Sequence, residues 1–509
     1  MSRAPVFLGL AIAGCAVGPD FKHPETAVAA SWTSGDARLA PQTADSQWWK
    51  SFNDPALDHL VDLAYRQNLP LQIAGLRIVE ARAQFGVATG MQFPQKQQVS
   101  ADLTAIGLTK PISDITMFPR NLLSYQAGFD AAWELDFWGK YRRGVEAEGA
   151  TLLGSVADYQ SALVSLSAEV ARTYVAIRTS EVLIRLAQEN AKVQEGGLDI
   201  AQSRFKNGAT SELDPTQATT QLESTRATIP QIQISLSQQR NALATLLGQP
   251  SGTIEALLGG PQEIPKPPAK VAVGVPAEML RRRPDIRSAE LAAAAQCARI
   301  GVAKAELYPS FSLLGTIGLR ALNKGPGSHN LFTTDAINYN AGPSISWPIL
   351  NYGRLTNSVR VQDARFQQAL VAYRDTVLRA AQEVEDALAG FLNAQQAMVF
   401  EQNAVTSAKR SVELALVAYR EGATDFQRVL DAQRSLLQEQ NALAQTTSSV
   451  ATNLVALYKS LGGGWEPREG QPVVPVETQE EMKQRTWWGE VLSKPRSPET
   501  ANTPPAGKQ

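Results

Sequence analysis

The sequence is poor in the residues and motifs that mark enzymes, metal proteins and nucleic-acid-binding proteins. It has only 2 cysteines and 3 histidines in 509 residues, and it lacks nucleotide-binding, zinc-protease and serine-hydrolase motifs. Because these motifs are missing, we expect no enzymatic activity and no cofactor. His23, His59 and His329 lie far apart in the sequence, so we also expect no metal site. Lys and Arg number 48 against 49 Asp and Glu, so no basic excess points to nucleic acid.

Long apolar runs are also missing. After the first 14 residues, no segment approaches the roughly 20 apolar residues that a membrane-spanning helix needs. The 19% of charged residues suits neither a disordered chain nor a helical membrane protein. If this chain enters a membrane, it must therefore do so as a β-barrel.

The N-terminus has the features of a bacterial lipoprotein signal. Arg3 precedes an apolar run at residues 6–13, and Gly14 directly precedes Cys15. We predict that residues 1–14 are a signal peptide and that Cys15 is acylated and becomes the mature N-terminus. Two alternatives are an ordinary cleaved signal with an incidental cysteine and a wrongly assigned start. Cys297 lies in an Ala-rich helical stretch, and we expect it to be a buried, unreactive thiol.

The chain contains one structural unit written twice, because matching residues recur with a spacing of 214. The clearest matches are Trp133 with Trp347, Trp138-Gly139-Lys140 with Tyr352-Gly353-Arg354, Gly208 with Gly422, and Leu247-Gly248 with Leu461-Gly462. We predict repeats at 15–249 and 277–465, joined by a Pro- and Gly-rich linker at 250–276. Residues 466–509 are predicted to be a Pro-rich, flexible tail.

Each repeat contains a predicted β-hairpin, at 97–137 and 310–350. Apolar and polar residues alternate along these segments, which gives one apolar and one polar face. A soluble antiparallel sheet has the same pattern, but strands of roughly 11–14 residues are long enough to cross a bilayer when tilted. Aromatic residues near the strand ends are candidates for the membrane interface: Trp133, Trp138, Trp347 and Tyr352.

Four strands cannot close a barrel, and open strand edges are not tolerated in lipid. The subunit must therefore oligomerise, and three copies would supply twelve strands.

Two very long helices are predicted at 141–206 and 354–421, which contain no proline. At about 1.5 Å per residue each would span roughly 100 Å. Their apolar residues follow a spacing of four and three, which is typical of coiled coils. A solvated coiled coil without a conduit is the alternative. Gly208 and Gly422 are predicted to end these helices, with returning helices at 216–247 and 426–461; Pro230 should kink or break the first of these.

Several motifs together resemble the TolC-like outer-membrane factors, in the lipoprotein branch that includes OprM- and NodT-type proteins. They are the start from Cys15 to Phe21, Trp48-Trp49, Asp54-Pro55, the highly specific Arg-Arg-Arg-Pro-Asp-Ile-Arg run at 281–287, Tyr308-Pro309-Ser310, and Leu430-Asp-Ala-Gln-Arg434. The likeness covers about residues 15–465. It implies an α+β membrane protein: a homotrimer with a twelve-stranded outer-membrane β-barrel, four strands per chain, a long periplasmic α-helical barrel and a mixed equatorial domain.

The resemblance also implies a function, location and partners. The chain would be a passive conduit that exports small molecules or drugs, lipid-anchored in the bacterial outer membrane and extending into the periplasm. Its partners would be outer-membrane lipid, a periplasmic membrane-fusion adaptor and an inner-membrane efflux pump, commonly a proton-driven one of the RND type. Two alternatives are a channel for type I protein secretion and a structural coiled-coil lipoprotein without a pore.

The helix turns at 207–214 and 421–431 would form the periplasmic mouth. In the resemblance, mouth-gating aspartates match Asp425, Asp431 and Asp214, while Arg428 occupies a position that is acidic in some relatives. A threefold ring of carboxylates can bind cations or pair with Arg and so set a closed state; solvated helix-end charge is the alternative. Arg204, Lys206 and Arg420 are candidates for contact with the adaptor, the alternative being plain surface charge.

Overall fold

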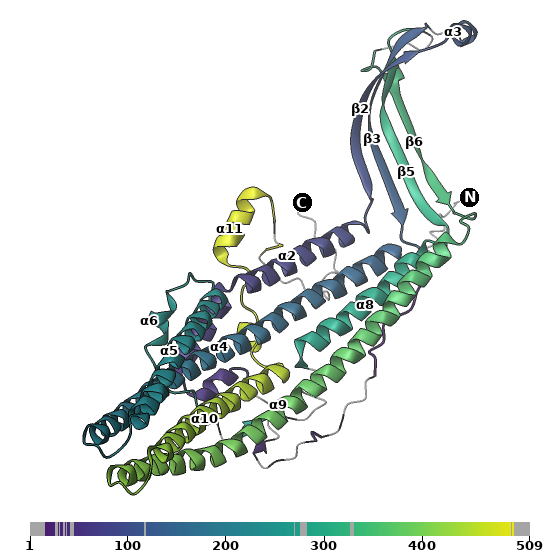
Figure 1. Ribbon diagram of the computed structural model, residues 1–509. Coiled ribbons are helices and arrows are strands. Elements are labelled where there is room, and N and C mark those ends of the chain that lie inside the picture. Colours follow the sequence, from purple (N-terminus) through teal and green to yellow (C-terminus); the bar gives the residue numbers. More distant parts are fainter. Residues whose placement is uncertain are drawn as a thin grey trace.

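In the computed structural model, the chain is an elongated molecule in which a sheet stands at one end of a bundle of long helices (Figure 1). The structure describes residues 16–25, 29, 31–33, 36, 38–40, 45–116, 119–268, 270–274, 282–325, 330–489 and 491–492. The predicted signal peptide and Cys15 lie outside the described residues.

The sheet has four antiparallel strands in the order β2-β3-β5-β6. The strands are β2 (Lys96–Gly107), β3 (Asn121–Leu135), β5 (Ser310–Leu322) and β6 (Ile337–Ser346). Each repeat contributes one hairpin, and β3 pairs with β5 to join the two. Short elements, α3 (Lys110–Thr116) and η2 (Thr334–Ala336), lie between the strands of the two hairpins.

Strand β3 ends two residues earlier than the predicted hairpin, at Leu135. The carboxylate of Asp136 accepts hydrogen bonds from the backbone N–H groups of Tyr141 and Arg142, at 3.0 and 2.9 Å. Because Asp136 satisfies free N–H groups at the start of the long helix that follows, the chain turns there from strand to helix.

The helical body is built on two antiparallel helix pairs. Its helices are α1 (Pro55–Gln67), α2 (Leu69–Gly90), α4 (Lys140–Lys206), α5 (Leu213–Leu246), α8 (Pro284–Ala305), α9 (Arg354–Arg420) and α10 (Phe426–Ser460). The two longest, α4 and α9, have 67 residues each; they pair with α5 and α10 respectively (Figure 1). None of the helices described here is both long and apolar enough to cross a membrane.

Apolar residues of α4 and α9 that follow the spacing of four and three are buried in the core of the helical body. Val170, Tyr174 and Ile177 of α4 are fully buried, as are Leu388 and Phe391 of α9. They share one apolar cluster with residues of α1 and α10. The helices are therefore held together by the stripe that the sequence indicates. Cys297 is also buried, as expected.

The region between the repeats is packed against the core and is more than a connector. It contains α6 (Ile254–Leu258) and strand β4 (Val271–Ala272), which pairs in parallel with β1 (Leu39–Ala40). Ile254, Leu258 and Val271 are buried in the main cluster. Pro and Gly content predicts a linker at 250–276, but its apolar residues fix it to the helices.

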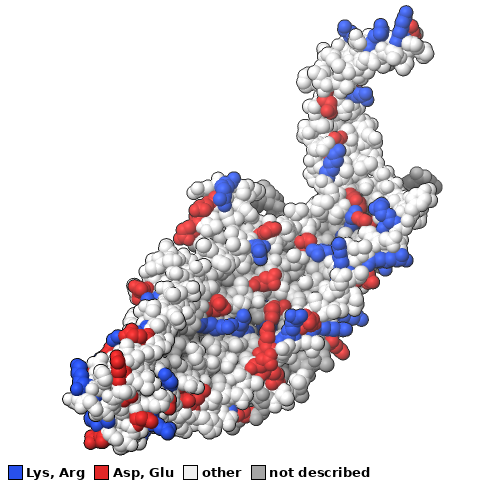
Figure 2. All heavy atoms as spheres, in the orientation of Figure 1, with Lys and Arg blue, Asp and Glu red and all other residues white. Residues whose placement is uncertain are grey.

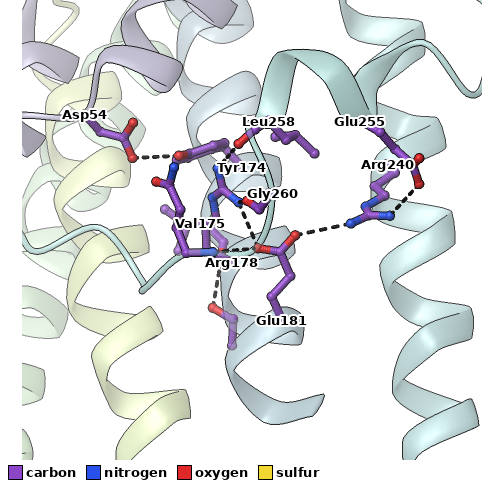
Figure 3. Close-up of polar contacts among 11 residues, drawn as sticks. Asp54, Tyr174, Val175, Arg178, Glu181, Arg240, Glu255, Leu258 and Gly260 are labelled. Carbon is purple, nitrogen blue, oxygen red and sulfur yellow. Dashed lines mark hydrogen bonds and ion pairs between the residues drawn. The ribbon is translucent and has the colours of Figure 1, made fainter. Parts of the chain in front are cut away.

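A buried ion network on α4 also fixes this region (Figure 3). Arg178, which is fully buried, donates hydrogen bonds to the carbonyls of Leu258 and Gly260, both at 2.6 Å. It also pairs with Glu181 at 2.8 Å, and Glu181 pairs with Arg240 of α5 at 3.3 Å. Arg178 thus joins the linker to α4, while Glu181 extends the connection to α5.

Pro230 was predicted to kink or break its helix, and the predicted break is wrong, because α5 runs without interruption from Leu213 to Leu246. Pro230 is exposed, and so is Arg226, whose carbonyl loses its intrahelical partner. Water can bond to this carbonyl at the surface, so the proline costs little here.

The tail prediction needs correction for residues 466–492. This segment contains η3 (Glu466–Arg468) and α11 (Val476–Arg485). Val474, Met482 and Leu492 are buried against Val79 of α2, and Arg82 donates to the carbonyl of Val491 at 3.0 Å. Trp488 packs against this cluster, whereas Trp487 is 94% exposed. A few well-spaced apolar residues give the segment a packed face that its proline content obscures.

Candidate functional site

The two helix turns at the end of the body farthest from the sheet have the same backbone geometry. Gly208 and Gly422 adopt positive φ angles of 72° and 76°, which only glycine adopts readily. After each glycine, an alanine N–H bonds back to the helix: Ala209 to Arg204 and Ala423 to Ala418, both at 2.8 Å. This is the glycine-ended helix terminus that reverses the chain.

Three of the predicted gate residues lie exposed on the second turn, that of α9 and α10. Asp425 is the N-cap of α10 and accepts a hydrogen bond from the backbone N–H of Arg428 at 3.3 Å. Asp431 accepts from the side chain of Gln427 at 2.9 Å. The described part of the chain contains no ion pair between Arg428 and Asp425, so no such pair forms within the subunit.

Asp214, the fourth predicted gate residue, lies on the first turn, that of α4 and α5. It contacts the second helical hairpin, which α9 and α10 form. Its carboxylate accepts a hydrogen bond from the hydroxyl of Tyr419 at 2.8 Å. Tyr419 is buried, and its ring also packs against Phe426 with 5.0 Å between ring centroids. Desolvation on burial, together with this bond, raises the pKa of Tyr419 to about 12. The tips of the two hairpins are therefore joined.

Arg204 strengthens the same connection. Its guanidinium lies 4.7 Å from the centre of the Tyr419 ring, and it donates a hydrogen bond to the Tyr419 carbonyl. Arg204 is therefore half-buried against the second hairpin and is no free surface charge, whereas Lys206 and Arg420 are exposed. We call Arg204, Asp214 and Tyr419 the tip latch.

Sequence reasoning missed Tyr419, although a signal was present. The repeat spacing aligns Tyr419 with Phe205, so the second copy has a hydroxyl that the first copy lacks. The spacing likewise aligns Asp214 with Arg428, which have opposite charge. Differences between otherwise matching copies indicate where the two hairpins have different roles.

The predicted interfacial aromatics gather where the sheet meets the helices. The indole N–H groups of Trp133, Trp138 and Trp347 donate to backbone carbonyls of Gln92, Pro309 and Leu307, at 3.2, 2.8 and 3.1 Å. Trp347 is 56% exposed and Tyr352 is 97% exposed. An exposed ring with a satisfied polar atom suits the border between lipid and water.

The chain that follows Cys15 runs along this junction. The N–H of Val17 donates to the carbonyl of Trp138 at 3.0 Å, and Gly139 is so close to Ala16 that an added Cβ would lie 2.8 Å from it. The first described residue is thereby placed beside the base of the sheet.

Charges of both signs are interspersed over the tips of the helical hairpins, while the visible face of the sheet carries only isolated charges (Figure 2). Among the residues described, no group of three or more His, Cys, Asp or Glu could hold a metal ion.

Comparison with known proteins shows which family has a similar sequence. The family model described as "Outer membrane efflux protein" matches residues 60–249 and 275–463. The probable efflux pump outer membrane protein TtgC of Pseudomonas putida is 33% identical over 90% of this chain and 95% of its own length. The probable outer membrane lipoprotein SilC of Salmonella typhimurium is 31% identical over 91% of this chain and 98% of its own.

The solved structure of the outer-membrane channel OprN is similar to most of this fold. It covers 89% of this chain and 100% of its own, with a TM-score of 0.81 and 34% sequence identity. The predicted α+β channel fold, with four strands in each chain, is thereby confirmed. The match in both repeats, in the sheet and in the long helices means that this chain belongs to the outer membrane efflux protein family.

Proposed function

We propose that three copies of this chain form the outer-membrane channel of a tripartite efflux system, a passive conduit for small molecules. The observation that carries the proposal is the sheet, whose outer strands β2 and β6 have no partner on one side within the described chain. One face of the sheet is apolar and exposed, with Val99, Ile317 and Tyr339 at 83, 58 and 81%. Such a face suits lipid, where unpaired strand edges are not tolerated.

Edge-to-edge pairing of three subunits would give every outer strand a partner and would turn the apolar face of each sheet towards lipid. Twelve strands would close, and the long helices below them would continue the wall of the duct into the periplasm. The polar face of the sheet would line the interior. A periplasmic adaptor and a proton-driven inner-membrane pump of the RND type would then deliver cargo to the helix tips, where Lys206 and Arg420 are exposed for contact.

The mouth at the helix tips would be the gate. Asp425 and Asp431 repeat three times in a trimer, and their exposed carboxylates can bind cations or pair with Arg428 of a neighbouring subunit. The tip latch holds the two hairpins of one subunit together. Opening then requires that the hairpins separate or shift past one another.

Cys15 would carry the lipid anchor. The hydrogen bond from Val17 to Trp138 supports this, because it brings the chain beside the interfacial aromatics, within reach of the inner leaflet. Acyl mass on the N-terminal peptide, lost in Cys15→Ser, is the expected result. An N-terminal peptide without acyl mass would contradict the anchor and leave the channel untouched.

The test of the channel itself combines native mass with single-channel recording in planar bilayers. The detergent-extracted protein should be a trimer that conducts ions, and it should restore drug resistance to a strain that lacks its own channel. A folded monomer in detergent, or a trimer without conductance, would contradict the proposal.

A further inference from the structure

One row of the sheet combines a single fixed charge with polar neighbours on all four strands. Gln98 of β2 pairs in register with Asp130 of β3, Asp130 with Thr316 of β5, and Thr316 with Asn340 of β6. We call these four residues the polar row. Because they face the same side of each strand, the row crosses the whole width of the sheet in one subunit.

The polar row lies on the face opposite the apolar one. Phe129, the neighbour of Asp130 on β3, points to the other side and pairs in register with Val99 and Ile317. These three are exposed apolar side chains. If the apolar face meets lipid, as in the proposed channel, the carboxylate of Asp130 faces the duct.

Neutral donors hold this carboxylate in place. The hydroxyl of Thr316 donates to one oxygen at 3.0 Å. The amide of Gln98 and the hydroxyl of Ser100 donate to the other, at 3.2 and 3.5 Å. Within the described chain, Asp130 forms no ion pair with a Lys or Arg. Its charge is therefore oriented without being neutralised by a bonded cation.

The next row along the same face leaves space beside Asp130. It contains Gly128 and Gly318, which pair in register. A Cβ added to Gly318 would lie 2.6 Å from the carbonyl oxygen of Ala127 and 2.8 Å from the Cα of Gly128, so this close approach requires glycine. No side chain at these two positions can cover the carboxylate on that side.

We propose that Asp130 determines the charge selectivity of the barrel, by forming a ring of three fixed carboxylates that favours cationic over anionic solutes. This inference rests on the proposed trimeric channel. A ring of like charges inside a duct raises the local concentration of counter-ions and lowers that of co-ions. Lys96 lies one row away on the same face, and Asp102 and Arg320 lie two rows away, where both pair in register with Gln126. Within the described chain, neither Lys96 nor Arg320 forms an ion pair with Asp130. Loss of the Asp130 charge therefore shifts the balance towards anions.

The experiment is the reversal potential of the reconstituted channel across a KCl gradient. The wild type should favour potassium over chloride, and Asp130→Asn should lower the permeability ratio by about twofold or more at low salt, where charges act over about 30 Å. Asparagine keeps an oxygen for Thr316, so the sheet should fold, and native mass checks the trimer. Asp130→Glu, which restores the charge, should keep most of the selectivity.

A matched control removes one carboxylate elsewhere. Asp114→Asn alters α3, which follows the end of β2 and lies off the strands of the duct, and it should leave the reversal potential unchanged. The shift caused by Asp130→Asn should also persist when Asp425 at the mouth is replaced by Asn, because the two rings lie at opposite ends of the molecule.

The outcomes separate this inference from the proposed function. A conducting Asp130→Asn channel with the reversal potential of the wild type would overturn the inference and leave the channel intact. A shift that Asp114→Asn reproduces would also overturn it, because any surface carboxylate would then suffice. A wild-type trimer that conducts nothing would instead reject the proposed function.

Discussion

The hydroxyl of Tyr419 lies 2.8 Å from the carboxylate of Asp214, and this contact joins the tips of the two helical hairpins. The two residues belong to different repeats and meet at the end of the molecule farthest from the sheet. A hydrogen bond between a neutral hydroxyl and a carboxylate is strong enough to bias a movable contact, yet weak enough to be broken by a binding partner.

Tyr419→Phe should loosen the tips. The substitution removes one hydrogen bond to a charged group, worth about 1–2 kcal/mol, and keeps the packed ring. Single-channel recording should show a higher resting conductance or more frequent openings than in the wild type. Tyr352→Phe is the control. It removes a hydroxyl from a side chain that is 97% exposed, and it should leave the resting conductance and the frequency of openings unchanged. Unaltered conductance in Tyr419→Phe would exclude the tip latch from gating.

Between neutral and strongly alkaline pH, the tip latch should be insensitive to pH. The pKa of Tyr419 is raised from its ordinary value of 10.0 to about 12. Because the folded-state pKa is raised, the stabilising effect is fully present below pH 10.0 and is lost as the pH rises through about 12. The difference in conductance between wild type and Tyr419→Phe should thus stay constant from neutral pH to pH 10.0 and vanish as the pH rises through about 12. A difference already lost near neutral pH would contradict this assignment.

Asp425→Ala should change the resting conductance, with a direction that reveals how the mouth is closed. If the carboxylate ring is held by Arg428 or by cations, its removal opens the mouth; if the ring repels itself, removal tightens it. Either effect should weaken in high salt, because exposed charges are screened within about 8–10 Å. Recordings at low and high salt distinguish the two. Identical traces for both proteins would leave Asp425 as the N-cap of α10 and nothing more.

Arg178→Met should destabilise the folded protein by about 3 kcal/mol. The substitution leaves the buried carboxylate of Glu181 with Arg240 as its one charged partner, beside the backbone N–H of Gln262, and deprives two linker carbonyls of their donor. Arg185→Met is the matched control, since its side chain is 47% exposed and pairs with Glu263 at 2.6 Å. That loss should cost no more than about 1 kcal/mol. Thermal unfolding midpoints in detergent compare the two variants with the wild type. Equal midpoints for Arg178→Met and Arg185→Met would show that the buried network contributes little to stability.

Gln194→Leu should stabilise the protein by about 1–2 kcal/mol. Gln194 is 2% exposed on α4, and neither polar atom of its amide has a partner among the described residues. Leucine of similar size removes this unsatisfied group. Gln202→Leu changes an exposed position of the same helix and should shift stability by less than about 0.5 kcal/mol. A lower thermal midpoint for Gln194→Leu would mean that the amide has a partner in the assembled channel.

Local and periodic signals in the sequence were sufficient to predict several features of the fold. Alternation of apolar and polar residues predicted the strands, the spacing of four and three predicted the coiled-coil seam, and Gly208 and Gly422 predicted the two turns. The spacing of 214 predicted two matching halves. Each signal needs only residues within a few turns or a repeated register, so no knowledge of distant neighbours is required.

Contacts between side chains far apart in the sequence were not predicted and are seen only in the folded chain. Asp214 and Tyr419 are 205 residues apart in the sequence, and Arg178 and Gly260, which are hydrogen-bonded, are 82 residues apart. Val474 and Met482 pack on α2, although the proline content of their segment indicated a flexible tail. Such contacts depend on which helices lie side by side and how each is rotated, and these are set by the packing of the whole core. The mismatch of Tyr419 with Phe205 between the two repeats marks the position, but it does not say which side chain Tyr419 will meet.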